Sequence, residues 1–126
     1  MCLAAAWKNG AAATQDASGA WRTVMDESSS YLEASCTAAF ACAFLRAAEF
    51  GFVGADTAAD YRTRAARALA CLEGWINDNG DLTHASTGTS IKPDAAGYNA
   101  IPFAVTTFSQ GLGLLAFAQT LSETKN

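Results

Sequence analysis

The stretch over residues 31–52, YLEASCTAAFACAFLRAAEFGF, is the feature that most constrains the fold of this chain. It predicts one long helix with almost no polar face, because its strongly polar side chains are confined to Glu33, Arg46 and Glu49. A helix that is apolar nearly all round is buried on several sides rather than laid on a surface. Its alanines allow neighbouring helices to approach closely, and its phenylalanines fill the remaining gaps. The fold must therefore place this helix in an inner layer.

Two further long helices are predicted, and they differ in kind. Residues 58–77 carry one apolar stripe opposite several arginines, so this helix has one face in water. Residues 103–121 are apolar around most of the circumference and include Gly111 and Gly113. Each glycine lowers helix propensity by about 1 kcal/mol relative to alanine. Such glycines are typical of places where a neighbouring backbone must come close, which indicates a second buried helix.

The loops alternate in length along the chain. Long loops over about 15–30 and 78–102 precede the two buried helices, whereas a short loop over about 51–57 precedes the amphipathic one. Within this loop-rich sequence, residues 20–25 have an extended pattern and residues 82–85 a short strand pattern. The alternation is that of an inner and an outer ring of helices, with the long loops on one rim. Helix N-termini on that rim would favour an anionic substrate group.

The start of the central helix is predicted from a capping box. Ser30 would be the N-cap, and Glu33 would reach back to the Ser30 N–H. Glu33 has a second interpretation, as a carboxylate that lines a pocket at the mouth of an inner helix. Both roles can hold at once, so the sequence leaves them open.

Composition and charge exclude several classes of protein. The 126 residues are 51% hydrophobic and 16% charged, with a net charge of -4, so they are enough for one domain with one core. No basic run exists, which argues against nucleic acid or an anionic membrane as a partner. No apolar run reaches the length of a membrane span. The N-terminus lacks a basic n-region, which predicts a cytoplasmic protein if this N-terminus is the natural one.

Metal and nucleophile chemistry have little support. The four cysteines include no CxxC pair, and His84 is the single histidine that could join them. Their predicted role is that of small buried hydrophobes, so no zinc site is expected. His84 has no nearby nucleophile arrangement and is interpreted as a loop residue. No glycine-rich phosphate loop follows a strand, so nucleotide binding is not expected.

Three sequence pieces resemble a known family over about residues 15–121. They are W-x-x-V-x-D with Y-L-E-A-S, the Gly-Thr pair at 88–89, and Y-x-x-I-P followed by QGL-x-LLA. They resemble the C-terminal part of glycoside hydrolase families 105 and 88, the unsaturated rhamnogalacturonyl and glucuronyl hydrolases. The resemblance implies an all-α fold in which residues 1–126 form a single partial domain of an (α/α)6 toroid. About three long helices and two long rim loops would be its share of the ring.

The resemblance also implies a reaction. Family members release a 4,5-unsaturated uronic acid from pectin- or glycosaminoglycan-derived oligosaccharides. An aspartic acid protonates the vinyl ether double bond and water then adds, so no metal or cofactor is needed. The catalytic aspartate, and the histidine and the arginine and tryptophan cluster that hold the sugar, belong to the N-terminal half of the toroid. Those motifs do not occur here, so no catalytic residue is assigned and no independent catalysis is expected.

Several residues at the expected rim are candidates for contact with the oligosaccharide. The resemblance and the rim position together predict four substrate-binding residues, Glu33, Tyr31, Thr89 and Tyr98. Tyr31 has packing at the rim as its alternative role. Trp21 could stack on a sugar or cover the end of the core, and Asp26 is expected to hydrogen-bond a rim loop.

A second class of function is left open. An incomplete ring would expose the faces of inner helices, and large apolar patches of that kind drive association. The alternative prediction is therefore a non-catalytic helical remnant, or an interaction module that associates with itself through exposed helix faces.

Overall fold

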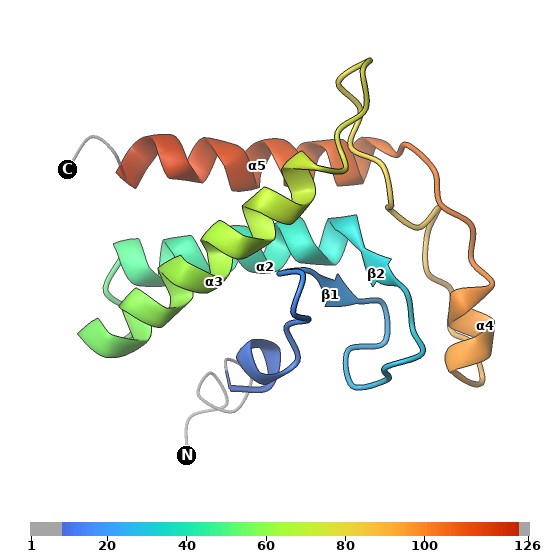
Figure 1. The fold of residues 1–126 in the computed structure, drawn as a ribbon, viewed down its shortest axis with the longest axis horizontal. Coiled ribbons are helices and arrows are strands. Elements are labelled where there is room, and N and C mark those ends of the chain that lie inside the picture. Colours follow the sequence, from blue (N-terminus) through green and yellow to red (C-terminus); the bar gives the residue numbers. More distant parts are fainter. Residues whose placement is uncertain (1–8, 124–126) are drawn as a thin grey trace.

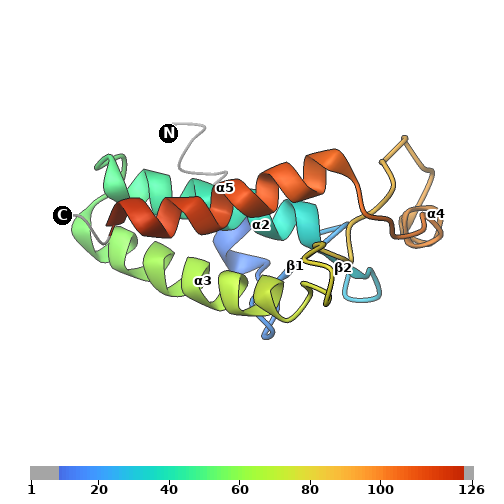
Figure 2. The same ribbon diagram turned by 90° about the horizontal axis from the view of Figure 1, so that it is seen from above.

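The computed structural model describes residues 9–123, and most of them lie in helices (Figure 1). The three long helices of this part of the chain are α2, Ala34–Glu49, α3, Ala55–Glu73, and α5, Thr107–Glu123. Helices α2 and α5 run in the same direction, and α3 runs opposite to them (Figures 1 and 2). The prediction of an all-α fold with two apolar helices and one amphipathic helix is confirmed.

Smaller elements lie at the end of the molecule where α2 and α5 begin (Figure 1). Strands β1, Trp21–Arg22, and β2, Leu32–Glu33, pair antiparallel with Trp21 opposite Glu33. The short helix α4, Ala95–Asn99, belongs to the loop that leads into α5. Residues 9–13 are also helical. The long loops therefore gather on one rim, as the sequence predicts.

The core forms where α2 packs against both α3 and α5. Phe44 of α2 is fully buried, with its ring centroid 4.2 Å from that of Tyr61 on α3 and 5.7 Å from that of Trp21. Four α2 alanines, Ala34, Ala38, Ala41 and Ala48, are buried at the helix contacts. Small residues at contacts and rings in the gaps give the packing expected of an inner helix.

The prediction of Ser30 as the N-cap of α2 is wrong. Glu33 is the N-cap, with φ -132° and ψ 130°, and its own carboxylate accepts a hydrogen bond from the Cys36 N–H. The reason is the β1–β2 pair, which keeps Glu33 extended so that the helix cannot begin before Ala34. The Ser30 N–H donates instead to the Glu27 carbonyl at 3.0 Å.

The other helix boundaries also differ from the sequence pattern. Helix α3 begins after Gly54 and ends at Glu73, earlier than the predicted 58–77. Helix α5 begins at Thr107, because residues 102–104 are held extended by pairing with residues 85–87. The strand predicted over 82–85 is not formed: Leu82 makes one isolated bridge with Ile76, and Ser86, directly after this range, makes another with Phe103.

The two glycines of α5 have different surroundings. A Cβ at Gly113 would lie 2.9 Å from Leu82 Cδ2, whereas a Cβ at Gly111 would meet nothing within 4 Å. The prediction that a neighbouring backbone comes close at both glycines is therefore wrong. At Gly113 the close neighbour is a side chain, and Gly111 faces open space.

Within residues 9–123, no helix is long and apolar enough to cross a membrane.

Candidate functional site

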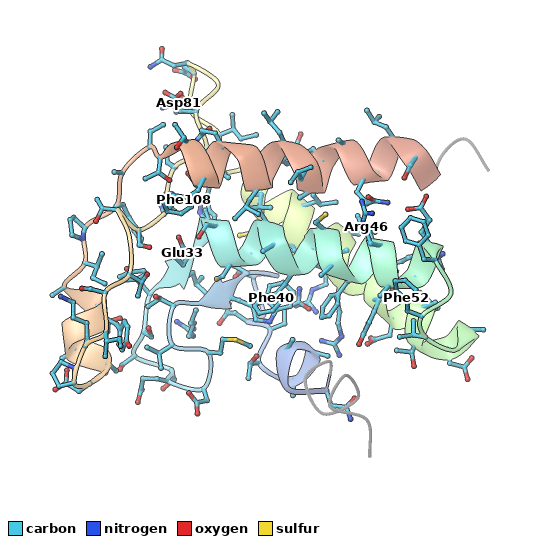
Figure 3. All side chains as sticks on the ribbon, turned by 180° about the vertical axis from the view of Figure 1, so that it is seen from behind. Glu33, Phe40, Arg46, Phe52, Asp81 and Phe108 are labelled. Atoms are coloured by element: carbon cyan, nitrogen blue, oxygen red, sulfur yellow. The ribbon has the colours of Figure 1, made fainter. Side chains whose placement is uncertain are left out.

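Glu33 lies at the start of α2, facing the rim loops (Figure 3). Its side chain is 3% exposed. Its Oε1 accepts from the Ser86 N–H at 2.9 Å, and its Oε2 accepts from the Cys36 N–H at 2.8 Å. The Ser35 hydroxyl lies within 2.9 Å of both oxygens. One carboxylate thus caps the helix and binds the loop that passes over it.

The N-terminus of α2 is already supplied with acceptors. The Ala34 N–H donates to the His84 carbonyl at 2.9 Å, in addition to the bond between Cys36 and Glu33. The helix dipole favours an anion at this N-terminus, and the Glu33 carboxylate already lies there. At α2, a residue of the chain therefore takes the place predicted for an anionic substrate group. Burial and then the Glu33 charge raise the pKa of the Cys36 thiol, so this thiol stays protonated at neutral pH.

Tyr31 is half-buried directly before β2. Its ring packs edge-on against Phe103, with centroids 4.7 Å apart. Its hydroxyl oxygen is buried and has no hydrogen-bond partner among the described residues. Burial raises the pKa of Tyr31, so it is a neutral phenol over the ordinary pH range. The contact with Phe103 agrees with the alternative role of Tyr31, packing at the rim. The role of Tyr31 in substrate binding stays a prediction.

Thr89 and Tyr98 lie on the long segment between α3 and α5. Thr89 is exposed, and Tyr98 is half-buried on α4. The loop is fastened by Asn99, whose Oδ1 accepts from the Ser30 hydroxyl at 3.1 Å and the Tyr31 N–H at 3.2 Å. Sequence reasoning missed Asn99, because an asparagine in an irregular segment gives no signal of a partner about 70 residues away.

A second missed feature is a continuous aromatic row, which consists of Trp75, His84, Phe103 and Tyr31. The Trp75 and His84 rings are stacked with centroids 4.8 Å apart and planes 13° apart. The His84 and Phe103 centroids are 5.5 Å apart. His84 is therefore part of a ring cluster rather than an isolated loop residue. The four residues come from separate segments and form no sequence motif, so the row could not be predicted from the sequence.

Trp21 has the surroundings of a structural residue, whereas Asp26 makes no hydrogen bond among the described residues, so its predicted bond to a rim loop is not found. Trp21 is fully buried, and its Nε1–H donates to the Ala11 carbonyl at 2.7 Å, which excludes stacking on a sugar. Asp26 is exposed on the wall of an open hollow of about 410 Å³. Arg22 also lines this hollow and forms an ion pair with Asp16 at 2.7 Å. None of the four predicted binding residues lines it.

The described part of the chain has no cluster of three His, Cys, Asp or Glu side chains that could hold a metal ion. Cys36, Cys42 and Cys71 are free thiols. Cys2 lies outside the described residues.

The helical arrangement is that of part of an α/α toroid, as comparison with solved structures shows. A crystal structure described as a possible member of the GH105 family from Salmonella enterica superposes with a TM-score of 0.82 at 33% identity, over 90% of this chain and 29% of that one. A similarly described protein from Klebsiella pneumoniae gives a TM-score of 0.81 at 34% identity, with the same coverage of both chains. Both matched structures are toroids of the glycosidase type.

Sequence comparison agrees with the structural match. The Glycosyl Hydrolase Family 88 pattern matches residues 5–123, and the chain belongs to this family. The unsaturated rhamnogalacturonyl hydrolase YesR of Bacillus subtilis is 30% identical over 112 residues, which are 88% of this chain and 30% of YesR. The chain thus spans less than a third of the length of each of these relatives.

Proposed function

We propose that this chain is the C-terminal sector of a glycoside hydrolase that releases 4,5-unsaturated uronic acid from pectin- or glycosaminoglycan-derived oligosaccharides. The observation that carries the proposal is the family match over residues 5–123, joined to the similarity with YesR. In this reaction a carboxylic acid protonates the vinyl ether double bond, water adds to the resulting cation, and the product opens to release the rest of the oligosaccharide. The proton donor would come from outside this chain.

The proposed role of this sector is to shape the substrate rim. The Glu33 carboxylate joins the start of α2 to the loop at Ser86, and Asn99 joins α4 to the segment before β2. Both connections hold rim loops in place without any external group. Glu33, Tyr31, Thr89 and Tyr98 are the proposed substrate contacts of this sector.

The first test uses the isolated chain. We expect no loss of the ultraviolet absorbance of a 4,5-unsaturated disaccharide, because the catalytic acid is proposed to lie elsewhere. Turnover by the isolated chain that disappears in Glu33→Gln would contradict the proposal that the acid is missing from it.

The second test uses a chimera in which this chain replaces the matching residues of YesR. We expect the chimera to keep hydrolysis of an unsaturated rhamnogalacturonan disaccharide. The circular dichroism spectrum and a cooperative thermal transition establish that the chimera is folded, and a Salmonella enterica chimera provides a second background. A folded chimera without turnover in both backgrounds counts against the proposed function.

An observation on α5 favours a second candidate, self-association of the isolated chain. The face of α5 turned away from α2 is apolar, and Leu114 and Leu115 on it are 72% and 59% exposed. Leu121 and Phe108 extend the same face, and Figure 3 shows Phe108 near the start of the helix. Residues 107–122 include no charged side chain. Without the rest of a toroid, a second copy of this chain would cover this surface.

Sedimentation equilibrium tests this candidate. We expect a concentration-dependent dimer for the chain, and a monomer for Leu114→Glu with Leu115→Lys. Phe52→Ala is the control, because Phe52 is 78% exposed but lies in the loop after α2, outside α5. A monomer at all concentrations would reject self-association.

A further inference from the structure

The turn over residues 77–81 is the closed tip of a hairpin. The Gly80 N–H donates to the Asn77 carbonyl at 2.9 Å, and the Asn77 N–H donates to the Asp81 carbonyl at 3.0 Å. Gly80 has φ 84°, the left-handed conformation that a glycine after a turn supplies in many hairpins. The turn projects past α5 in Figure 1, and Figure 3 labels Asp81 within it. Its conformation is therefore set by its own hydrogen bonds.

The asparagines of the loops differ in how their side chains are bonded. Asn77 Oδ1 accepts from the Asn79 N–H at 3.0 Å and from the Asp81 N–H at 2.9 Å. Asn99 uses both its Oδ1 and its Nδ2 in hydrogen bonds to residues 29–31. The side chain of Asn79 is exposed and makes no hydrogen bond among the described residues. Its carboxamide is therefore free to rotate toward the backbone that follows it.

The residue that follows Asn79 favours a reaction between this carboxamide and the backbone. The carboxamide carbon of an asparagine is open to attack by the next backbone nitrogen, and a side chain on that next residue hinders the approach. Gly80 has no side chain, and even a Cβ built there would meet nothing within 4 Å. The attack requires the Gly80 N–H to leave the Asn77 carbonyl, and exposed loop tips open locally at little cost in free energy. Both reacting groups are thus available at the same turn.

We propose that Asn79 is a site of spontaneous deamidation, and that its isoaspartate product opens the turn over residues 77–81. The Gly80 nitrogen forms a bond to Asn79 Cγ, the bond from Cγ to Nδ2 breaks, and Nδ2 leaves as ammonia with the proton from the Gly80 nitrogen. Water then opens the cyclic imide. Addition of water at Cγ gives aspartate. Addition at the backbone carbonyl carbon of residue 79 gives isoaspartate, and the main chain then runs through the former side chain.

Isoaspartate lengthens the backbone inside the turn by one methylene group. The bonds that the Gly80 and Asp81 N–H groups donate to Asn77 both span the lengthened segment, so the closed tip is lost. The loosening ends at Leu82, whose N–H donates to Gln110 Oε1 at 2.9 Å and whose carbonyl accepts from Gln110 Nε2 at 2.8 Å. These two bonds hold the base of the hairpin on α5 independently of the turn.

Peptide mass spectrometry of the folded chain after incubation in mildly alkaline buffer tests the reaction. The chain carries Asn9→Gln in every sample, so that residues 79 and 80 form the one Asn-Gly pair. We expect conversion of Asn79 at least about tenfold faster than that of Asn77 or Asn99, whose side chains are bonded and whose next residue is not glycine. Enzymatic methylation of isoaspartate should label the incubated chain and leave Asn79→Gln unlabelled. Conversion of Asn99 as fast as that of Asn79, or a labelled Asn79→Gln chain, would overturn the site.

Amide hydrogen exchange tests the opening of the turn. In the chain that carries isoaspartate, we expect several-fold faster exchange at Gly80 and Asp81, and unchanged exchange at Leu82. Asn79→Asp is the matched control, because it adds the charge of the product without lengthening the backbone, and it should exchange like the unmodified chain. Unchanged exchange at Gly80 and Asp81 in the isoaspartate form, or equally fast exchange in Asn79→Asp, would contradict the proposed opening.

Discussion

At the scale of single residues, Glu33 shows how one side chain joins three segments. It ends β2, caps α2 and accepts from the Ser86 backbone, all with one buried carboxylate. The prediction that Glu33 bonds the Ser30 N–H in a capping box is wrong, because Glu33 is itself the N-cap and accepts from the Cys36 N–H. Because both oxygens accept from N–H groups, the site requires a group with two acceptors.

Glu33→Gln is expected to lower the free energy of unfolding by about 1–3 kcal/mol. The amide places an NH₂ group opposite either the Cys36 or the Ser86 N–H, so one buried donor loses its acceptor. Urea denaturation followed by circular dichroism measures the effect. Glu73→Gln on α3 is the control, because Glu73 is exposed, and equal stability of the two variants would contradict the role of the Glu33 carboxylate.

The lowered pKa of Asp16 makes the stability of the chain depend on pH. The Ser18 N–H and the Ser18 hydroxyl, followed by Arg22, lower the pKa of Asp16 below the ordinary range of an aspartate. A lowered folded-state pKa adds stability above the unfolded-state pKa, and this contribution is lost as pH falls through the folded-state value. Asp16→Asn should therefore cost up to about 1 kcal/mol at pH 7 and almost nothing near pH 2. Urea denaturation at both pH values checks this, and a cost that does not shrink in acid would count against the assignment.

At the scale of elements, the helix boundaries are set by what pairs with the flanking residues. Helix α2 begins only after β2 ends. Helix α5 begins only after the pairing between residues 85–87 and 102–104 ends. Hydrophobic periodicity does not predict such pairings, because the same residues fit the helical pattern whether or not they pair with another segment. The prediction for the two glycines of α5 is wrong for a similar reason. Both stand in the same sequence context, but a Cβ would meet a side chain only at Gly113.

Gly111→Ala is expected to raise the free energy of unfolding by about 1 kcal/mol, because alanine has the higher helix propensity and its Cβ meets open space. Gly113→Ala should lose this gain, since its Cβ would lie 2.9 Å from Leu82 Cδ2 and the leucine must shift. Thermal denaturation of the two variants gives the comparison. The prediction is wrong if Gly113→Ala is as stable as Gly111→Ala.

At the scale of the whole molecule, stability depends on one ring cluster where three segments meet. Phe44 from α2 contacts both Tyr61 from α3 and Trp21 from β1, and all three rings are buried. In the described part of the chain, the outer side of α5 carries the exposed leucines Leu114, Leu115 and Leu121. The chain therefore has a packed centre between α2 and α3, and an apolar edge along α5.

Phe44→Ala is expected to cost about 3–5 kcal/mol, because it empties the centre of this cluster. Phe44→Leu fills part of the space and should cost less, so it gives a measurable transition even if the alanine variant unfolds. Phe52→Ala is the exposed control, expected within about 0.5 kcal/mol of the parent. A cost for Phe44→Leu no larger than that of Phe52→Ala would show that the cluster is not central to stability.

Sequence alone determined the class of this protein. The apolar helix over residues 31–52, the amphipathic helix after it and the alternation of loop lengths predict layered helices, because burial imposes a local and periodic pattern on the chain. The three motif pieces then indicate the family, and the match over residues 5–123 confirms it. All of these signals lie within short stretches of sequence.

Only the tertiary structure decided how the rim is built. The Glu33 bond to Ser86, the Asn99 bonds to Ser30 and Tyr31, and the aromatic row each join positions that are tens of residues apart. Such contacts depend on the register of strands and the path of loops, which neighbouring residues do not encode. The helix that organises the chain was thus visible in its composition, while the surface at its N-terminus came from long-range pairing.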